Sequence, residues 1–222
     1  MDAYSIFSLV TRTIALAILL ALGAAAPASA QDQPPRLPFI VVDLHGAFTS
    51  FPSSQALVDS RGLTDLTQLP GGSLGGDVAL HLYPLRWRAV TFGIGGRVMG
   101  ARGHQAAPAT GGEVPLTPVT EQFLTAAPEL SFNFGSGNGW SYISGGIGRS
   151  IWQVVPDGAV RQDVDEERRQ TSNYGGGARW FMKKHLAFSF DVRVYGVKAG
   201  TVGLLPAPRA NLLVIAAGAS IK

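Results

Sequence analysis

Residues 186–197 read Leu-Ala-Phe-Ser-Phe-Asp-Val-Arg-Val-Tyr-Gly-Val, and this alternation of apolar and polar side chains decides the fold. Phe188, Phe190 and Val192 share one face of an extended chain, whereas Asp191 and Arg193 share the other. Successive side chains of a β-strand point to opposite faces of its sheet, so the segment predicts a strand with one apolar and one polar face.

Seven more segments show the same character, and together they predict eight strands. The segments are 40–50, 73–83, 89–101, 123–134, 140–152, 171–182, 186–197 and 210–221. Each has about 10 to 13 residues, the length that a tilted transmembrane strand needs. The connections do not show the helical periods that a βαβ fold requires.

The connections alternate in length along the chain. Long ones cover 51–72, 102–122 and 153–170, with a moderate one at 198–209, and short ones cover 84–88, 135–139 and 183–185. Short turns on one side and longer loops on the other are typical of outer-membrane barrels, in which the short turns lie in the periplasm. The chain is therefore predicted to be all-β: an eight-stranded antiparallel up-and-down transmembrane β-barrel over residues 39–222.

The polar faces favour this membrane barrel over a soluble, exported, lipocalin-like barrel that binds a ligand. Outside the first thirty residues the only lysines are Lys183, Lys184, Lys198 and Lys222, and all lie in turns, loops or at the end of the sequence. A solvated outer face normally carries lysine and glutamate. The residues expected to face lipid are Val42, Leu44, Val78, Leu80, Phe92, Ile94, Phe188, Phe190 and Val192, with an aromatic girdle of Tyr83, Trp87, Phe132, Phe134, Trp140 and Trp180.

The first thirty residues predict a cleavable signal peptide. Arg12 supplies a positive charge, residues 14–22 are apolar, and Ala28-Ser29-Ala30 forms a small-residue cleavage site. Residues 31–38 form a polar, proline-rich lead-in to the barrel.

Composition excludes several classes of protein. The 222 residues include no cysteine, which excludes disulfides, thiol catalysis and Cys-ligated metal sites. A net charge of +3 is too small to indicate nucleic acid. The low fraction of charged residues, 15%, together with a positive mean hydropathy of +0.18, argues against a disordered chain.

These features resemble a known family. The signal peptide, the eight strands and the glycine-rich stretches 144–148 and 174–178 are similar to the small OmpA/OmpX-type outer-membrane barrels. The resemblance implies a bacterial outer-membrane location and assembly by the barrel assembly machinery. Such barrels often finish on an aromatic residue, whereas this sequence finishes Ser220-Ile221-Lys222.

The polar faces also predict a network of charges inside the barrel. Its members are Asp43, His45, Asp77, His81, Arg97, Glu129, Arg179, Asp191 and Arg193. Because an unpaired buried ion costs several kcal/mol, the charges must pair. The register predicts that Arg97 bridges Asp77 and Glu129, that Arg179 or Arg193 holds Asp191, and that Asp43 meets His81.

Two positions interrupt the strand pattern. Pro128 cannot donate to the ladder, which predicts a bulge or an interruption in the fourth strand. Arg149 has the parity of the lipid-facing Ile147, which predicts either a bulge that changes the phase or an arginine that extends its charge to the outer rim.

No motif of catalysis, cofactor binding or metal binding stands out. The glycine-rich stretches lack the sequence of a phosphate loop, and no nucleophile elbow occurs. The sequence therefore favours a non-enzymatic, monomeric surface barrel with a filled lumen, no cofactor and no nucleic-acid partner. The alternative within the membrane is a narrow porin-like channel. The expected partners are outer-membrane lipid and lipopolysaccharide, with long loops such as 163–169 available for a surface ligand.

Overall fold

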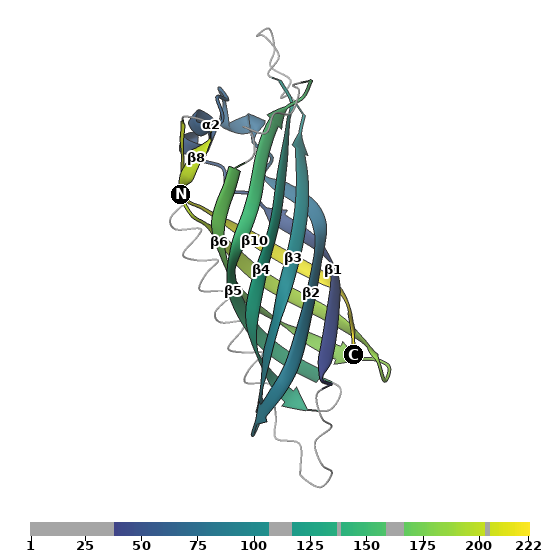
Figure 1. Cartoon of the computed structure of the whole chain (residues 1–222). Coiled ribbons are helices and arrows are strands. Elements are labelled where there is room, and N and C mark those ends of the chain that lie inside the picture. The colour runs from purple at the N-terminus through teal and green to yellow at the C-terminus, as the bar shows by residue number, and fades with distance from the viewer. Residues whose placement is uncertain (1–37, 107–116, 137–138, 159–166, 203–204) are drawn as a thin grey trace, which may run out of the picture. The chain divides into compact units, whose positions relative to one another are not determined.

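The strands form one closed barrel (Figure 1). The computed structural model describes residues 38–106, 117–136, 139–158, 167–202 and 205–222. The barrel strands are β1 (Ile40–Ser50), β2 (Gly72–Trp87), β3 (Val90–Gln105), β4 (Val119–Ser136), β5 (Gly139–Pro156), β6 (Glu167–Phe181), β7 (Leu186–Val197) and β10 (Ala210–Ile221). Each pairs antiparallel with its neighbours, and β1 closes the ring on β10, so the predicted eight-stranded barrel is confirmed.

The remaining elements belong to two long connections. Helix α2 (Gln55–Ser60) and the 3-10 turn η1 (Leu66–Gln68) lie between β1 and β2, and a hairpin of β8 (Gly200–Val202) and β9 (Leu205–Ala207) lies between β7 and β10. Figure 1 shows α2 and β8 at one end of the barrel and the carboxyl terminus toward the other. No helix among the described residues is long and apolar enough to cross a membrane. The predicted signal peptide and lead-in lie outside the described residues, except for Pro38.

The strand boundaries agree with the prediction at three strands and extend beyond it at the other five. Strands β1, β7 and β10 have the predicted bounds, whereas β3, β4, β5 and β6 continue for four residues into the long connections. The extensions pair with one another, as Glu121 does with Val154 and Gln105 with Val119. Strands that pair beyond the apolar band lose the regular alternation on which the prediction depended.

Proline breaks the ladder at two places. The expected disturbance at Pro128 is an interruption without a bulge, because β4 pairs with β5 at Ala126 and again at Glu129 in an unshifted register. A register shift lies instead between Leu82 and Leu85 of β2, beside Pro84. The extra residue there changes the phase of the strand. As a result, the predicted turn at 84–88 is largely strand, and the chain reverses at Arg88 and Ala89.

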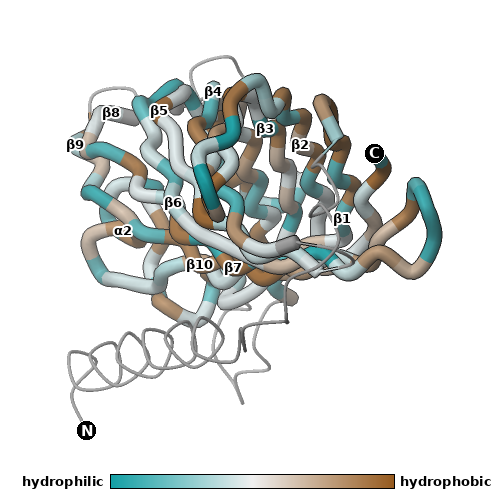
Figure 2. The backbone as a smooth tube through the Cα atoms, turned by 90° about the horizontal axis from the view of Figure 1, so that it is seen from below, coloured by the Kyte–Doolittle hydropathy of each residue, from teal (hydrophilic) through white to brown (hydrophobic). Residues whose placement is uncertain are grey.

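The apolar faces point away from the lumen. Leu44, Val78, Leu80, Ile94, Phe188 and Phe190 are exposed on the outer wall, and Val42, Phe92 and Val192 are partly exposed there. Figure 2 shows apolar and polar positions alternating along the strands. An outer wall of this kind excludes the soluble lipocalin-like carrier, whose apolar residues would fill the barrel. Arg149 also points outward, with the phase of β5 unchanged.

The predicted aromatic girdle is only partly correct. Trp87, Phe132 and Trp180 are exposed on the outer wall and Phe134 is partly exposed, but Tyr83 and Trp140 are buried in the lumen. Their positions have the parity of the polar face, so the prediction that they face lipid is wrong. They pack with other apolar residues to fill the short-turn end of the barrel.

The buried side chains inside the barrel form three layers. An apolar layer at the short-turn end contains Val41, Tyr83, Trp140, Phe181 and Ala187. A charged layer follows. A second apolar layer at the long-loop end joins α2 to the wall, and it includes Phe51, Leu57, Val58, Met99, Phe123, Trp152, Tyr195 and Leu212.

Placement of the outer wall in lipid is tested by a charge scan along one face of β2. Leu80→Arg puts a cation in the apolar band, where the cost is about 2–4 kcal/mol at mid-depth. Leu74→Arg on the same face lies near the long-loop end, where the cost falls to about 0–1 kcal/mol. We expect refolding into phospholipid vesicles, followed by urea titration, to show the larger loss of stability for Leu80→Arg. Equal losses would contradict the proposed depth of the two positions.

Candidate functional site in the barrel lumen

The middle layer of the lumen holds all nine residues of the predicted charge network. They come from β1, β2, β3, β4, β6 and β7, and each is at most 6% exposed. Every one lies on the face of its strand that points away from lipid. The curvature of the barrel determines which of these side chains come into contact.

Arg97 stands among three carboxylates. Its Nη1 donates to Asp77 Oδ1 at 2.5 Å and its Nε donates to Glu129 Oε1 at 3.1 Å, while its Nη2 lies 3.6 Å from Asp191 Oδ2. The contacts to Asp77 and Glu129 follow from the register, because each carboxylate is one diagonal step from Arg97 on a neighbouring strand. The third contact crosses the lumen from β3 to β7.

Arg193 completes this cluster from the opposite wall. Its Nε and Nη2 donate to the two oxygens of Asp191 at 3.2 and 3.1 Å, and its Nη1 donates to Glu129 Oε1 at 3.2 Å. The same guanidinium donates to Asn173 Oδ1 and to Ser144 Oγ, each at 2.7 Å. Arg193 therefore satisfies its donors with four side chains on four different strands.

Arg179 forms a second cluster with Asp43. Two parallel hydrogen bonds, of 2.8 and 2.6 Å, join its Nε and Nη2 to the carboxylate, which also accepts from the Ser220 hydroxyl. The guanidinium lies over the Tyr142 ring, 4.1 Å from its centroid. The Tyr142 hydroxyl in turn donates to Asp191 Oδ2 at 2.7 Å, which links the two clusters.

The prediction that Asp43 meets His81 is wrong. Asp43 binds Arg179 across the lumen, while His81 Nε2 lies 3.4 Å from Glu129 Oε2. The prediction considered only adjacent strands. Strands β1 and β6 are not neighbours in the barrel, but their inward side chains meet because a narrow ring brings opposite walls within reach.

Several polar residues of the network were not predicted. They are Tyr142, Asn133, Ser144, Asn173, Ser189 and Ser220, all buried hydrogen-bonding partners of the charged groups. Each has the inward parity of its strand, and that parity was the only available indication. A further buried pair higher in the lumen, Trp152 Nε1 donating to Glu121 at 2.6 Å, was also missed.

His45 links an acid to a hydroxyl. Its Nδ1 lies 2.9 Å from Asp77 Oδ1 and its Nε2 lies 2.7 Å from Ser189 Oγ. This is the order of groups in a Ser-His-Asp triad. Ser189 is fully buried, however, and Asp77 also binds Arg97.

The two remaining histidines lie apart from the lumen cluster. His104 is half exposed in β3 and lies 3.8 Å from Asp157, while His185 sits in the turn before β7. No group of three or more His, Asp or Glu side chains in the described part of the chain is arranged to hold a metal ion. Residues 163–166 of the charged loop lie outside the described residues.

Comparison with one solved structure supports the fold. No protein-family model matches the chain, and no curated protein matches it. The structure of Neisserial surface protein A is similar, with a TM-score of 0.53 and 10% identity over 83% of this chain and 97% of that one. Ail, the attachment invasion locus protein of Yersinia pestis, has a TM-score of 0.44 at 12% identity over 82% of this chain and 97% of its own. Outer membrane protein AlkL has a TM-score of 0.37 at 16% identity, covering 88% and 93%.

Three observations define the architecture: the closed ring of strands, the apolar outer wall and the structural similarity to Neisserial surface protein A. The chain has the fold of the small eight-stranded barrels of the OmpA/OmpX type, and its place is the bacterial outer membrane.

Proposed function

We propose that the protein is a non-enzymatic surface barrel that presents its long loops outside the cell and does not conduct solutes. The observation that carries this proposal is the filled lumen, with a charged layer between two apolar layers. An interior of eight strands is just wide enough for side chains to fill. The buried side chains at all three levels support a filled interior, and three arginines link strands that are not neighbours in the ring.

The first long connection packs into the long-loop end of the barrel. Leu57 and Val58 of α2 are buried in the upper apolar layer. Arg61, directly after α2, places its guanidinium over the Trp152 ring at 5.3 Å, and Arg169 lies over the same ring at 5.7 Å. These contacts hold the connection against β5 and β6, which supports a fixed cap over the lumen.

Closure of the lumen is tested by electrical recording. We expect the unmodified protein in planar bilayers to show no steady current. Arg97→Ala removes a cation from three carboxylates, and breaking a buried ion pair costs about 3–5 kcal/mol. We therefore expect the variant to unfold at lower urea and to show small, fluctuating conductance.

Arg86→Ala is the matched control, because Arg86 is exposed at the short-turn end of β2 and takes no part in the charge network. This variant should unfold at the same urea concentration as the unmodified barrel and show no steady current. A steady open channel in the unmodified protein would contradict the proposal and favour the narrow porin-like alternative.

The triad-like arrangement argues for structure rather than catalysis. A serine nucleophile must reach a substrate carbonyl, but Ser189 Oγ is enclosed and already bonded to His45. Asp77 supports Arg97 as well as His45, so its charge is shared. The three groups therefore act as one more link between β1, β2 and β7.

This interpretation predicts that Ser189 is inert toward a fluorophosphonate probe. Folded barrel in phospholipid vesicles should show no covalent adduct by mass spectrometry, while a serine hydrolase added to the same vesicles is labelled. An adduct on the unmodified protein that disappears in Ser189→Ala would establish a reactive serine and overturn the non-enzymatic assignment.

The proposed partners follow from the location. They are the barrel assembly machinery, lipopolysaccharide and a surface ligand at the long loops, and the proposed state is a monomer. The complete ring supports the monomer, because closure leaves no strand edge in the barrel for a second chain to pair with.

A further inference from the structure

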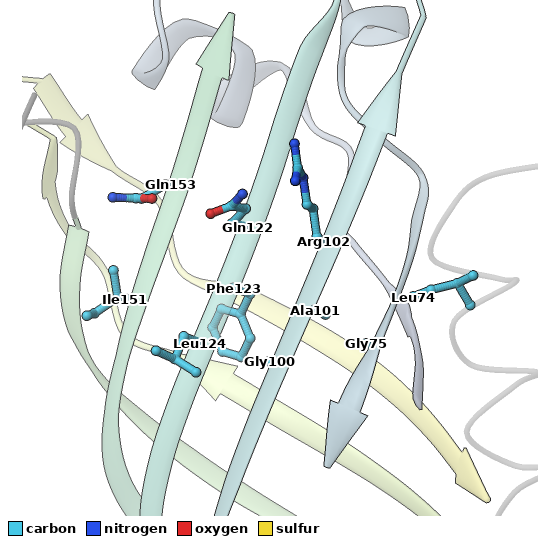
Figure 3. Close-up of a pocket in the computed structure, with 10 residues that line it drawn as sticks. All are labelled: Leu74, Gly75, Gly100, Ala101, Arg102, Gln122, Phe123, Leu124, Ile151 and Gln153. Atoms are coloured by element: carbon cyan, nitrogen blue, oxygen red, sulfur yellow. The ribbon is translucent and has the colours of Figure 1, made fainter. Parts of the chain in front are cut away.

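A hollow of about 420 Å³ lies on the outer wall over β2 to β5 (Figure 3). The outward-facing residues that line it are Leu74, Gly100, Arg102, Gln122, Leu124, Ile151 and Gln153, and the strand backbone contributes at Gly75, Ala101 and Phe123. None of these residues belongs to the charge network of the lumen. The hollow therefore faces the membrane, and the charge network of the lumen does not account for it.

Two cross-strand rows form the hollow. The upper row runs Leu74, Arg102, Gln122 and Gln153, each paired with the next across β2, β3, β4 and β5. The row below it runs Gly100, Leu124 and Ile151. The hollow thus has a polar edge directly above an apolar floor.

Gly100 keeps this floor open. A Cβ atom there would lie 3.5 Å from Leu124 Cδ1, which is ordinary contact, so the backbone does not require glycine at this position. A larger apolar side chain would instead fill the space beside Leu124. The absence of a side chain creates room for another apolar group.

The charge on this wall is positive. Among the side chains described on the barrel strands, every carboxylate points into the lumen, whereas Arg102 and Arg149 are exposed on the outside. Within the described ranges, neither of these arginines forms an ion pair. Arg149 follows Gly148 on β5, two residues before Ile151 of the floor. An outer wall with unpaired arginines beside apolar side chains complements an anionic lipid.

The height of Arg102 agrees with a headgroup position. Arg102 is the thirteenth residue of β3 counted from Val90 at the short-turn end. A rise of about 3.3 Å per residue and a strand tilt of about 40° put it roughly 30 Å above that end. The apolar band of such barrels is about 25 Å tall, so the guanidinium lies at the outer edge of the hydrocarbon.

We propose that this hollow binds a phosphorylated glycolipid of the outer leaflet, of the lipid A class. Arg102 holds a phosphate, Gln122 and Gln153 bind the neighbouring sugar hydroxyl and amide groups, and one acyl chain lies on Gly100 between Leu124 and Ile151. Arg149 provides a second cation beside the floor. This inference rests on the proposed partnership with lipopolysaccharide and assigns it a site.

The site is tested by titrating the folded full-length barrel in detergent with purified lipid A and counting bound lipid by native mass spectrometry. A charge-assisted hydrogen bond contributes about 1.5–3 kcal/mol, so Arg102→Gln should weaken binding about tenfold or more. Gly100→Leu, which fills the floor, should weaken binding about fivefold while it keeps every charge. Arg102→Lys should retain binding within about threefold.

Arg86→Gln is the control, because it removes the same charge from an exposed position at the opposite end of the barrel. Heat-modifiable gel mobility confirms that each variant is folded. Equal loss in Arg102→Gln and Arg86→Gln, or unchanged binding in Gly100→Leu, would overturn the site while leaving lipopolysaccharide as a partner. Absence of lipid A binding to the unmodified barrel would overturn both. Displacement of lipid A by equimolar phosphatidylglycerol would overturn the assignment to a glycolipid.

Discussion

The Arg97 guanidinium, held among Asp77, Glu129 and Asp191, is the interaction on which the interior of this barrel depends. Three carboxylates without a cation would repel one another in a space that excludes water. With Arg193 and Arg179 in place, four acids and three arginines become a set of links that tie β1, β2, β3, β4, β6 and β7 together. The same charged groups that make the lumen polar therefore also hold its strands together.

A network of this density needs small residues beside the large ones. At Gly177 of β6, a Cβ atom would lie 2.0 Å from the backbone oxygen of Phe190 and 2.8 Å from the Tyr142 hydroxyl. Any side chain there would displace the hydroxyl that donates to Asp191. The glycine-rich stretches that first suggested an outer-membrane barrel thus have a local reason, because they give the long inward side chains room to cross.

Much of the fold follows from local rules. The alternation of Phe188, Ser189, Phe190 and Asp191 fixes which side of β7 meets lipid, and the same argument applied to each strand selects the inward residues. Contacts between adjacent strands, such as Arg97 with Asp77, follow from register alone. The bond between Arg179 and Asp43 does not, because it joins strands that are apart in the ring. The curvature that brings them together exists only after the barrel closes.

Proline and the aromatic residues show the same division between local and global causes. Pro84 and Pro128 both lack a donor, yet only the region of Pro84 takes an extra residue, which turns Leu85 and Trp87 outward beyond it. A bulge changes which residues of a strand point inward. An alternation followed without a break through residues 83–88 therefore assigns the residues after the bulge to the wrong face. Tyr83 and Trp140 are residue types that suit a lipid girdle. The parity of their positions in the strands places them inside, where they pack at the short-turn end.

The charged residues have different surroundings on the inner and outer faces of the barrel. Inside, each arginine is committed to carboxylates on other strands and is inaccessible. Outside, Arg102 stands beside apolar side chains at the proposed level of the headgroups, and Arg149 lies lower on the same wall. Among the described residues neither guanidinium has an ion-pair partner, and we propose that a lipid phosphate is the counterion of Arg102. The proposed closure of the interior by its own ion pairs leaves two surfaces for the proposed recognition, the long loops and the upper part of the wall.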